Sequence, residues 1–290
     1  MEEKKDIGTA RIPRLPAKIG VERTMKISNS RRIVALTLLA GALGVAVGAQ
    51  TDLSRGRANS QPASSEQLFA LANRTRAAAG VGALQWDPAL AAAALQHCER
   101  MAAEGPIAHR YGGEADLSDR AGQAGAHFSL IEENVAVGPS AAEIHDGWMH
   151  SPGHRDNLLN PQVDRVGVAV VAVQGSLYAV ADYAQAVPVF STGGVEAAVA
   201  EKLRDRGMTV LRDTADARRV CAQDGDARGA WSGSQPSFLM QWQGPDVTQL
   251  PKSLLDRMAS GRYRQASVGS CAPHDVEGQF TVYRVAVLLY

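Results

Sequence analysis

Hydrophobic residues between positions 64 and 152 recur mostly at the spacing of an α-helix, which predicts three helices. Each helix carries boundary signals: a capping side chain, a proline in the first turn, or a glycine or proline at the end. These signals are Ser64 or Ser65 and Gly80 for the first helix, Asp87 and Pro88 for the start of the second, and Ser140 and Pro152 for the third. Between the second and third helices, residues 111–127 are expected to form a loop with about one helical turn.

Strand patterns follow the third helix. The apolar runs 165–173 and 177–186 indicate two consecutive strands, and Gly175 with Ser176 between them predicts a hairpin turn. The stretch "SLIEENVAVG" is also strand-like. Helices combined with a hairpin are typical of an α+β fold, so residues 64–188 are expected to form a domain in which helices enclose a sheet.

The remaining chain predicts a second, smaller α+β domain over residues 195–290. A helix is expected at 195–206 and a strand at 208–212, followed by a loop-rich stretch to about residue 237. The runs "FLMQWQ" and "FTVYRVAVLLY" indicate strands that flank a helix near 252–260.

The N-terminal segment is typical of an export signal rather than of a folded domain. Residues 1–24 are interpreted as an upstream extension before a start at Met25. Residues 25–49 contain a basic region, a short apolar run and small residues that end at Ala49, which predicts a cleaved signal peptide. An uncleaved anchor is the alternative, although the run is short for a membrane span. Residues 50–63 are expected to form a flexible spacer, and no stable membrane span remains after cleavage.

Composition narrows the class of protein and its partners. The 290 residues include 45% hydrophobic positions, enough for a substantial core, with 30 basic and 30 acidic side chains. This balance gives no indication of nucleic-acid binding. Of the three cysteines, Cys221 and Cys271 both lie in the C-terminal third and are expected to pair, as in an exported protein. Cys98 lies at a helical apolar position and is expected to be buried.

The segment "GWMHSPGHRDNLLNP" raises the question of a metal site, because His150 and His154 are four residues apart. On an unbroken helix both rings would reach one metal ion. Pro152 lies between them and ends the helix, so the two rings are not expected to share a face. We therefore expect His154 to enter a cavity alone from this segment, and His145 and His150 to be exposed.

The chain resembles the CAP superfamily, the group of cysteine-rich secretory, antigen 5 and pathogenesis-related 1 proteins, in its bacterial secreted form. The resemblance covers about residues 65–186. It rests on the ordered stretches "LANRTRAAAGVGALQWDPAL", "AHRYGG", "DLSDRAGQAGAHFSLIEENVAVG", "GWMHSPGHRDNLLNP", and "VGVAVV" with "YAVADYAQ". It implies an α-β-α sandwich (the CAP or SCP domain) with a shallow central cavity.

The resemblance also implies which residues line that cavity. They are His109 in "AHR", Glu133 in "EENVA" and His154 in "GHR". Many members have a second glutamate where this chain has Ser151, and Glu132 replaces the usual glycine before the Glu-Asn pair. The second carboxylate of the cavity is therefore either absent or supplied by Glu132.

The residue types leave three interpretations open. Two neutral imidazoles and a carboxylate can bind Zn²⁺ or another divalent cation and leave a position for water. The same groups can instead form a buried hydrogen-bonded network. Catalysis is the third interpretation, with Glu133 as the base for a metal-bound water or Ser151 as a nucleophile beside His154.

The function expected from these features is that of an exported binding or interaction module. Its cavity would bind a divalent metal weakly, and its ligand would be a lipid, a cell-wall glycan or a protein. The alternative is a metal-dependent hydrolase, a peptidase or esterase, that uses the same cavity. The fold does not decide between them, because one fold hosts many functions.

Overall fold

The computed structural model describes residues 59–223, 231–276 and 278–290. The predicted extension 1–24, the predicted signal peptide 25–49 and most of the predicted spacer lie outside the described residues. Residues 59–63, expected to end that spacer, instead form strand β1 (Asn59–Ser60) and the first residues of helix α1. Within the part of the chain that the structure describes, no helix is long and apolar enough to cross a membrane.

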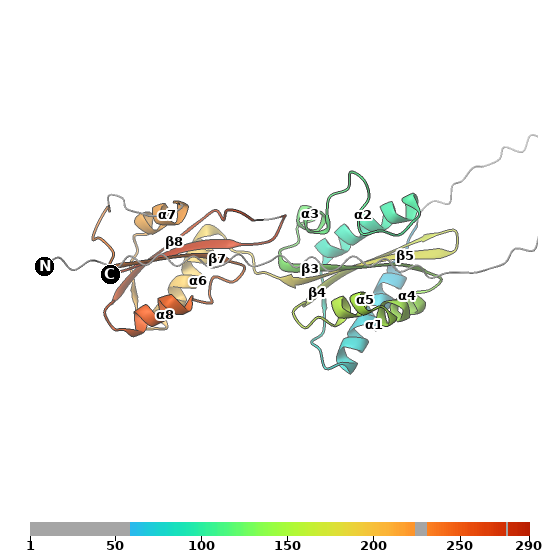
Figure 1. Ribbon diagram of the computed structural model, residues 1–290, viewed down its shortest axis with the longest axis horizontal. Helices are drawn as coiled ribbons and strands as arrows, with labels where there is room; N and C mark the ends of the chain where they lie inside the picture. The colour runs from blue at the N-terminus through green and yellow to red at the C-terminus, as the bar shows by residue number, and fades with distance from the viewer. Residues whose placement is uncertain (1–58, 224–230, 277) are drawn as a thin grey trace, which may run out of the picture. The chain divides into compact units, whose positions relative to one another are not determined.

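Contacts divide the described residues into two compact units. One unit combines residues 59–117 with Glu132–Tyr183, and the other combines Ser118–Ile131 with Ala184–Tyr290. Each unit contains a sheet with helices against it, which confirms the predicted α-β-α sandwich and the second α+β fold (Figure 1).

The first sheet has the strand order β1-β4-β5-β3, with β2 beside β4. Its longer strands are β3 (Phe128–Gly138), β4 (Arg165–Val173) and β5 (Ser176–Ala186), and β2 is Gln85–Trp86. The predicted hairpin joins β4 to β5, but its turn is Gln174-Gly175, one residue earlier than expected. Both turn residues have positive φ, 51° and 80°, which matches the twist of a tight hairpin.

Helices cover both faces of this sheet. Helix α2 (Pro88–Glu104) lies on one face, and α1 (Pro62–Ala78), α4 (Ala141–His150) and α5 (Pro152–Leu159) lie on the other (Figure 1). The α2 face is apolar because Cys98 and Met101 of the helix pack on Val135 of β3 and Val171 of β4. A Cβ built on Gly167 would lie 2.0 Å from the backbone nitrogen of Ala91, so only glycine allows this helix so close to β4.

The helix boundaries follow the sequence signals in part. Asp87 caps α2 by accepting the amides of Ala89 and Leu90, and Ser140 caps α4 by accepting the amide of Glu143. Helix α1 begins earlier than predicted, because Pro62 rather than a serine starts it. The predicted turn within 111–127 is helix α3 (Leu117–Gln123).

Pro152 has two roles, only one of which was predicted. It ends α4, as expected, and it also occupies the first turn of a separate helix, α5, that the sequence pattern did not predict. Proline suits that position because its missing N–H would have no intrahelical partner there. Its neighbour His154 is therefore helical, but on a different helix from His150.

The second sheet has the strand order β6-β8-β9-β7. Its strands are β6 (Thr209–Val210), β7 (Phe238–Gly244), β8 (Gln265–Cys271) and β9 (Tyr283–Leu289). Along β9, Val285 and Val287 pack with α6 (Thr192–Arg204) and α8 (Lys252–Ala259), whereas Ala286 and Leu288 pack with α7 (Ala215–Ala222). The sequence pattern predicted neither strand β8 nor helix α7. Helix α7 lies in the stretch that was expected to be a loop.

The cysteine predictions are confirmed. Cys221 at the end of α7 is bonded to Cys271 at the end of β8, and Cys98 is a buried thiol.

Candidate functional site

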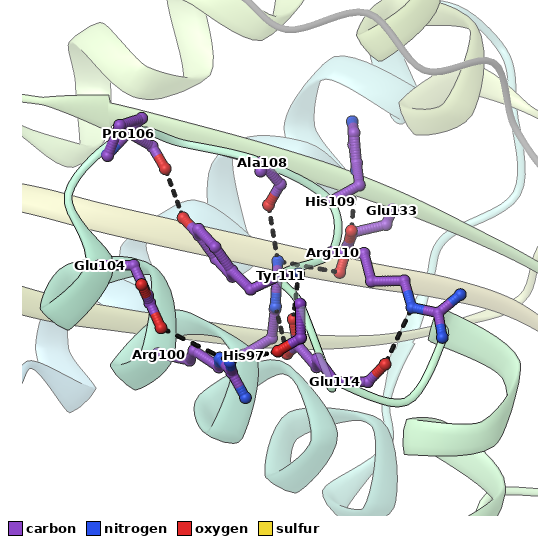
Figure 2. A network of polar contacts seen from close by, with 11 residues as sticks. His97, Arg100, Glu104, Pro106, Ala108, His109, Arg110, Tyr111, Glu114 and Glu133 are labelled. Atoms are coloured by element: carbon purple, nitrogen blue, oxygen red, sulfur yellow. Dashed lines mark hydrogen bonds and ion pairs between the residues drawn. The ribbon is translucent and has the colours of Figure 1, made fainter.

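The candidate site lies around Glu133 on β3, a strand at the end of the sheet order. The Glu133 side chain is 3% exposed, and its Oε1 lies 2.8 Å from Nδ1 of His109. His109 comes from the loop after α2, so the contact joins this loop to the sheet (Figure 2). An ionised carboxylate can only accept a hydrogen bond. Nδ1 of His109 is therefore the donor, and a metal ion would bind this ring through Nε2.

A third histidine, His97 of α2, extends this network and was not predicted. Its ring is fully buried, with Nδ1 2.7 Å from Oε1 of Glu114 and Nε2 2.9 Å from the carbonyl oxygen of Ala108. The same Nε2 lies 4.0 Å from Oε2 of Glu133. Figure 2 shows His97 between the helix and the loop that carries His109. His97 thus fixes the path of that loop.

The helical spacing of α2 contained a signal for His97. His97 lies four residues after Ala93 and four before Met101, and both of these are buried. A histidine on the apolar face of a helix needs polar partners when it is buried, so its position predicts a hydrogen-bonded network. The identity of those partners depends on the loop and could not be derived from this spacing.

His154 reaches the same region from α5. The side-chain amide of Asn134, next to Glu133 on β3, donates to the backbone oxygen of His154 over 2.9 Å. Asn157 donates to the backbone oxygen of Glu133 over 3.1 Å and to Oδ1 of Asn134 over 3.0 Å. These buried amides tie α5 to β3 and hold the backbone of His154 next to the strand that carries Glu133.

The His154 ring is buried without hydrogen-bond partners. The residue is 4% exposed, and among the described residues neither ring nitrogen has a hydrogen-bond partner. Burial, and to a smaller extent the proximity of His109, together lower the pKa of His154 to about 4. At neutral pH the ring is therefore uncharged, with one N–H and one lone pair available to a ligand.

A buried arginine, also not predicted, supports the far end of α5. Arg76 of α1 is 1% exposed and donates to backbone oxygens around the turn after α5 and in the loop after α1. The acceptors are Leu158 at 2.8 Å, Asn160 at 2.9 Å, Val163 at 3.0 Å and Gly82 at 2.6 Å. Backbone carbonyl oxygens accept all four of these hydrogen bonds. Arg76 therefore stabilises the conformation of these backbone segments.

The other residues singled out by sequence have structural positions. The carboxylate of Glu132 accepts two bonds from the Asn160 amide, at 3.0 and 3.1 Å, so it helps to hold the turn after α5. Ser151 joins α4 to α5, and its hydroxyl makes no bond to the His154 ring within the described chain. His150 is exposed, as expected. The prediction for His145 is wrong: this residue is 9% exposed, and its Nε2 lies 3.0 Å from Oγ1 of Thr75 on α1.

His109, His154 and Glu133 are of the residue types that bind divalent metal ions. His109 and His154 come from separate segments and lie close enough to interact electrostatically. Neither nitrogen of the buried His154 ring has a hydrogen-bond partner among the described residues. Glu133 already accepts the bond from His109, and this arrangement would orient the ring of a metal-binding histidine. No group of three or more His, Cys, Asp or Glu side chains with metal-site geometry occurs among residues 59–223, 231–276 and 278–290.

Comparison with known proteins adds a family match for the first unit. The model of the cysteine-rich secretory protein family, CAP, matches residues 69–183. An uncharacterized membrane protein of Bacillus subtilis (strain 168), YlbC, is 34% identical over 114 residues, which make up 38% of this chain and 32% of that protein. An uncharacterized protein of the same strain, YkwD, is 28% identical over 137 residues, which make up 46% of this chain and 52% of that protein. The chain thus spans about a third and about half of these relatives.

Two solved structures are also similar. One is an extracellular protein containing a SCP domain from Bacillus anthracis str. Ames, at 28% identity and a TM-score of 0.40, over 43% of this chain and 41% of that chain. The other is an outer surface protein from Borrelia burgdorferi, at 19% identity and a TM-score of 0.43, over 45% of this chain and 98% of that chain.

Proposed function

Because residues 69–183 of this chain form a CAP domain of the cysteine-rich secretory protein family, we propose that the protein is an exported binding module that holds a divalent metal weakly. The observation that supports this most directly is the His154 ring, which is buried, uncharged at neutral pH and without a hydrogen-bond partner among the described residues. A buried polar atom without a partner costs free energy, which a bound ligand would recover.

The metal would bind through His154 and through Nε2 of His109. Glu133 would keep His109 in the required tautomer by accepting its Nδ1 proton, at the observed 2.8 Å. When bound, the metal supplies a positive charge with open positions for a ligand oxygen. Two protein nitrogens give a low affinity, which should fall further in acid because a protonated imidazole cannot bind a metal.

Export is proposed on separate grounds. Residues 25–49 have the order of a secretory signal, and the disulfide between Cys221 and Cys271 is typical of an oxidising compartment. One relative carries the description of a membrane protein, so retention at the outer face of the membrane is part of the same proposal.

Zinc titration of the chelator-treated protein tests the metal site. We expect saturable zinc binding by the wild type in isothermal calorimetry at neutral pH, and binding weaker by at least about tenfold in His109→Ala and in His154→Ala. His150→Ala is the matched control, because this histidine is 72% exposed at the end of the neighbouring helix, and it should bind zinc as the wild type does. Equal binding by all four proteins would refute the site.

The hydrolase alternative has a separate readout. Glu133 is occupied by His109 and lies close to His97, so it serves the network rather than an open water site. We therefore expect no chelator-sensitive turnover of peptide or ester substrates by the purified protein. Turnover that is lost in Glu133→Gln and restored by zinc in the wild type would instead establish a metal-dependent hydrolase.

A further inference from the structure

Helix α5 begins with a first turn whose amides are uncapped. The first amides of any helix have no intrahelical acceptor. The N-cap residue, Ser151, makes no side-chain hydrogen bond to them. Pro152 has no N–H, so the donors that remain at this end are the amides of Gly153 and His154.

The first turn of α5 is open on the Cβ side of Gly153. A Cβ built on Gly153 would meet no heavy atom within 4 Å. The ring of His154, the third residue of α5, belongs to the same end of the helix, because helical side chains lean towards the N-terminus over the preceding turn. The residue is 4% exposed, and both ring nitrogens lack a hydrogen-bond partner in the described chain. The uncapped amides and the unpartnered ring thus occur together in the first turn of α5.

The charges at this position favour an anion. The N-terminus of a helix carries a partial positive charge, and a metal ion on the neighbouring histidines would add to it. A neutral imidazole that gives its lone pair to a metal retains one N–H, which needs an acceptor. An oxygen anion would accept from this N–H and from the helix amides, and would also offset both positive charges.

We propose that the first turn of α5 binds a small oxygen anion, a phosphate or carboxylate group, through the amides of Gly153 and His154 with the Ser151 hydroxyl and the His154 ring. This inference rests on the proposed function in one respect: the metal shares the His154 ring and tightens anion binding. The helix end alone still provides a weaker site without metal.

Amide resonances provide the test, because they report on Gly153 and His154 without any activity assay. The ¹⁵N-labelled, chelator-treated protein is titrated with sodium phosphate or sodium acetate at constant ionic strength, with chloride as the balancing anion. We expect saturable shifts of these two amides. Repeating the acetate titration with zinc should tighten binding by about tenfold, as expected for an added charge-assisted contact. Acetate is used here because zinc phosphate is insoluble.

Gly153→Glu is the decisive variant. Its side chain enters open space at the start of a helix, where a carboxylate is favourable, so the protein should fold. The new carboxylate competes for the same amides and should weaken acetate and phosphate binding by about tenfold. Gly193→Glu is the matched control at the second residue of α6, where a Cβ also meets nothing but Ser191 already caps the first turn. It should leave binding unchanged.

A vesicle-binding experiment distinguishes a lipid headgroup from a free anion as the ligand. A lipid headgroup would be supported if the protein co-sediments with phosphatidylcholine vesicles only when they contain phosphatidic acid. The Gly153→Glu variant should then not co-sediment. Saturable phosphate shifts without sedimentation would support a free anion.

The failures of the two proposals can be separated. Zinc binding without any anion-dependent shift of Gly153 and His154 would overturn the anion site and leave the metal site standing. Equal anion binding by Gly153→Glu and the wild type would overturn it as well. Anion shifts that persist in a protein unable to bind zinc would support the anion site and refute the metal-binding function.

Discussion

At the scale of single residues, His154 couples the stability of the CAP domain to pH. Its folded pKa is about 4, below the ordinary value of 6.5, because burial disfavours the charged ring. The unfolded chain therefore takes up this proton below about pH 6.5, whereas the folded chain takes it up only near pH 4. The stabilisation is fully present above the unfolded pKa and is lost as the pH falls towards 4. We expect about 3 kcal/mol of the free energy of unfolding to disappear over this interval.

Urea unfolding of the chelator-treated protein at a series of pH values measures this effect. The His154→Gln variant lacks the titrating ring, so its stability should fall less steeply between pH 6.5 and 4. The exposed His150 serves as the control position, and His150→Gln should retain the wild-type slope. An identical slope in His154→Gln and the wild type would show that the ring is not held neutral by the fold.

Residue-level prediction from sequence was strongest where a motif surrounds the side chain. The family resemblance predicted that His109, Glu133 and His154 share a cavity. In the structure His109 and Glu133 are in contact, and the shared cavity stays a prediction. His97 and Arg76 were missed because their partners are backbone oxygens and carboxylates from distant loops. Such contacts depend on the path of the chain in three dimensions, which hydrophobic spacing does not encode.

At the scale of elements, long periodic segments were predictable and short ones were not. The helix with Cys98 and the β4–β5 hairpin have clear patterns and clear boundary signals. Strand β8, "QASVGSC", consists mainly of small and polar residues, so its strand character comes from pairing with β9 rather than from propensity. Pro152 was ambiguous in a different way, because a proline that ends one helix also suits the first turn of the next.

Two glycines allow helices to lie directly on the sheets, which leads to a prediction. A Cβ on Gly167 would lie 2.0 Å from the backbone nitrogen of Ala91 in α2, and a Cβ on Gly269 would lie 2.1 Å from that of Arg218 in α7. Backbone cannot move aside as a flexible side chain can. We therefore expect Gly167→Ala and Gly269→Ala each to lower the free energy of unfolding by about 1–3 kcal/mol in urea titrations.

Gly244→Ala is the control for this pair of substitutions. Gly244 also lies in a strand, β7, but a Cβ there meets no atom within 4 Å. Its effect on stability should stay within about 0.5 kcal/mol, as for ordinary surface changes. If all three variants have the same stability, close helix–sheet contact is not the reason for glycine at positions 167 and 269.

At the scale of the whole molecule, the two units have a similar architecture but differ in the contacts that stabilise it. Each has a sheet with helices on both faces, and each contains a strand glycine under a helix. The first unit relies on buried polar contacts such as those of Arg76 and His97. The second has a disulfide that fastens α7 to β8. An exported protein can be stabilised both by buried polar contacts and by a disulfide, whereas a disulfide would not persist in a reducing compartment.

This difference predicts how the three cysteines respond to labelling and reduction. Burial raises the pKa of Cys98 to about 12, so its thiol should not react with maleimide in the native protein. Cys221 and Cys271 should not react either until the protein is reduced. Labelling of either before reduction would contradict the disulfide.

The paired substitution of Cys221 and Cys271 by serine tests what the disulfide contributes. The bond closes a loop with a sequence separation of 50 residues, and a loop of that length is stabilised by about 4 kcal/mol in the chain-entropy model. We expect the double variant to lose stability of this order in denaturant titrations followed by the fluorescence of Trp231 and Trp242, which lie in the second unit. Cys98→Ala, which removes a thiol outside the loop, should respond to added reductant as the wild type does. If the double variant is as stable as the oxidised wild type, the packing of helices and strands alone is sufficient to hold α7 against the sheet.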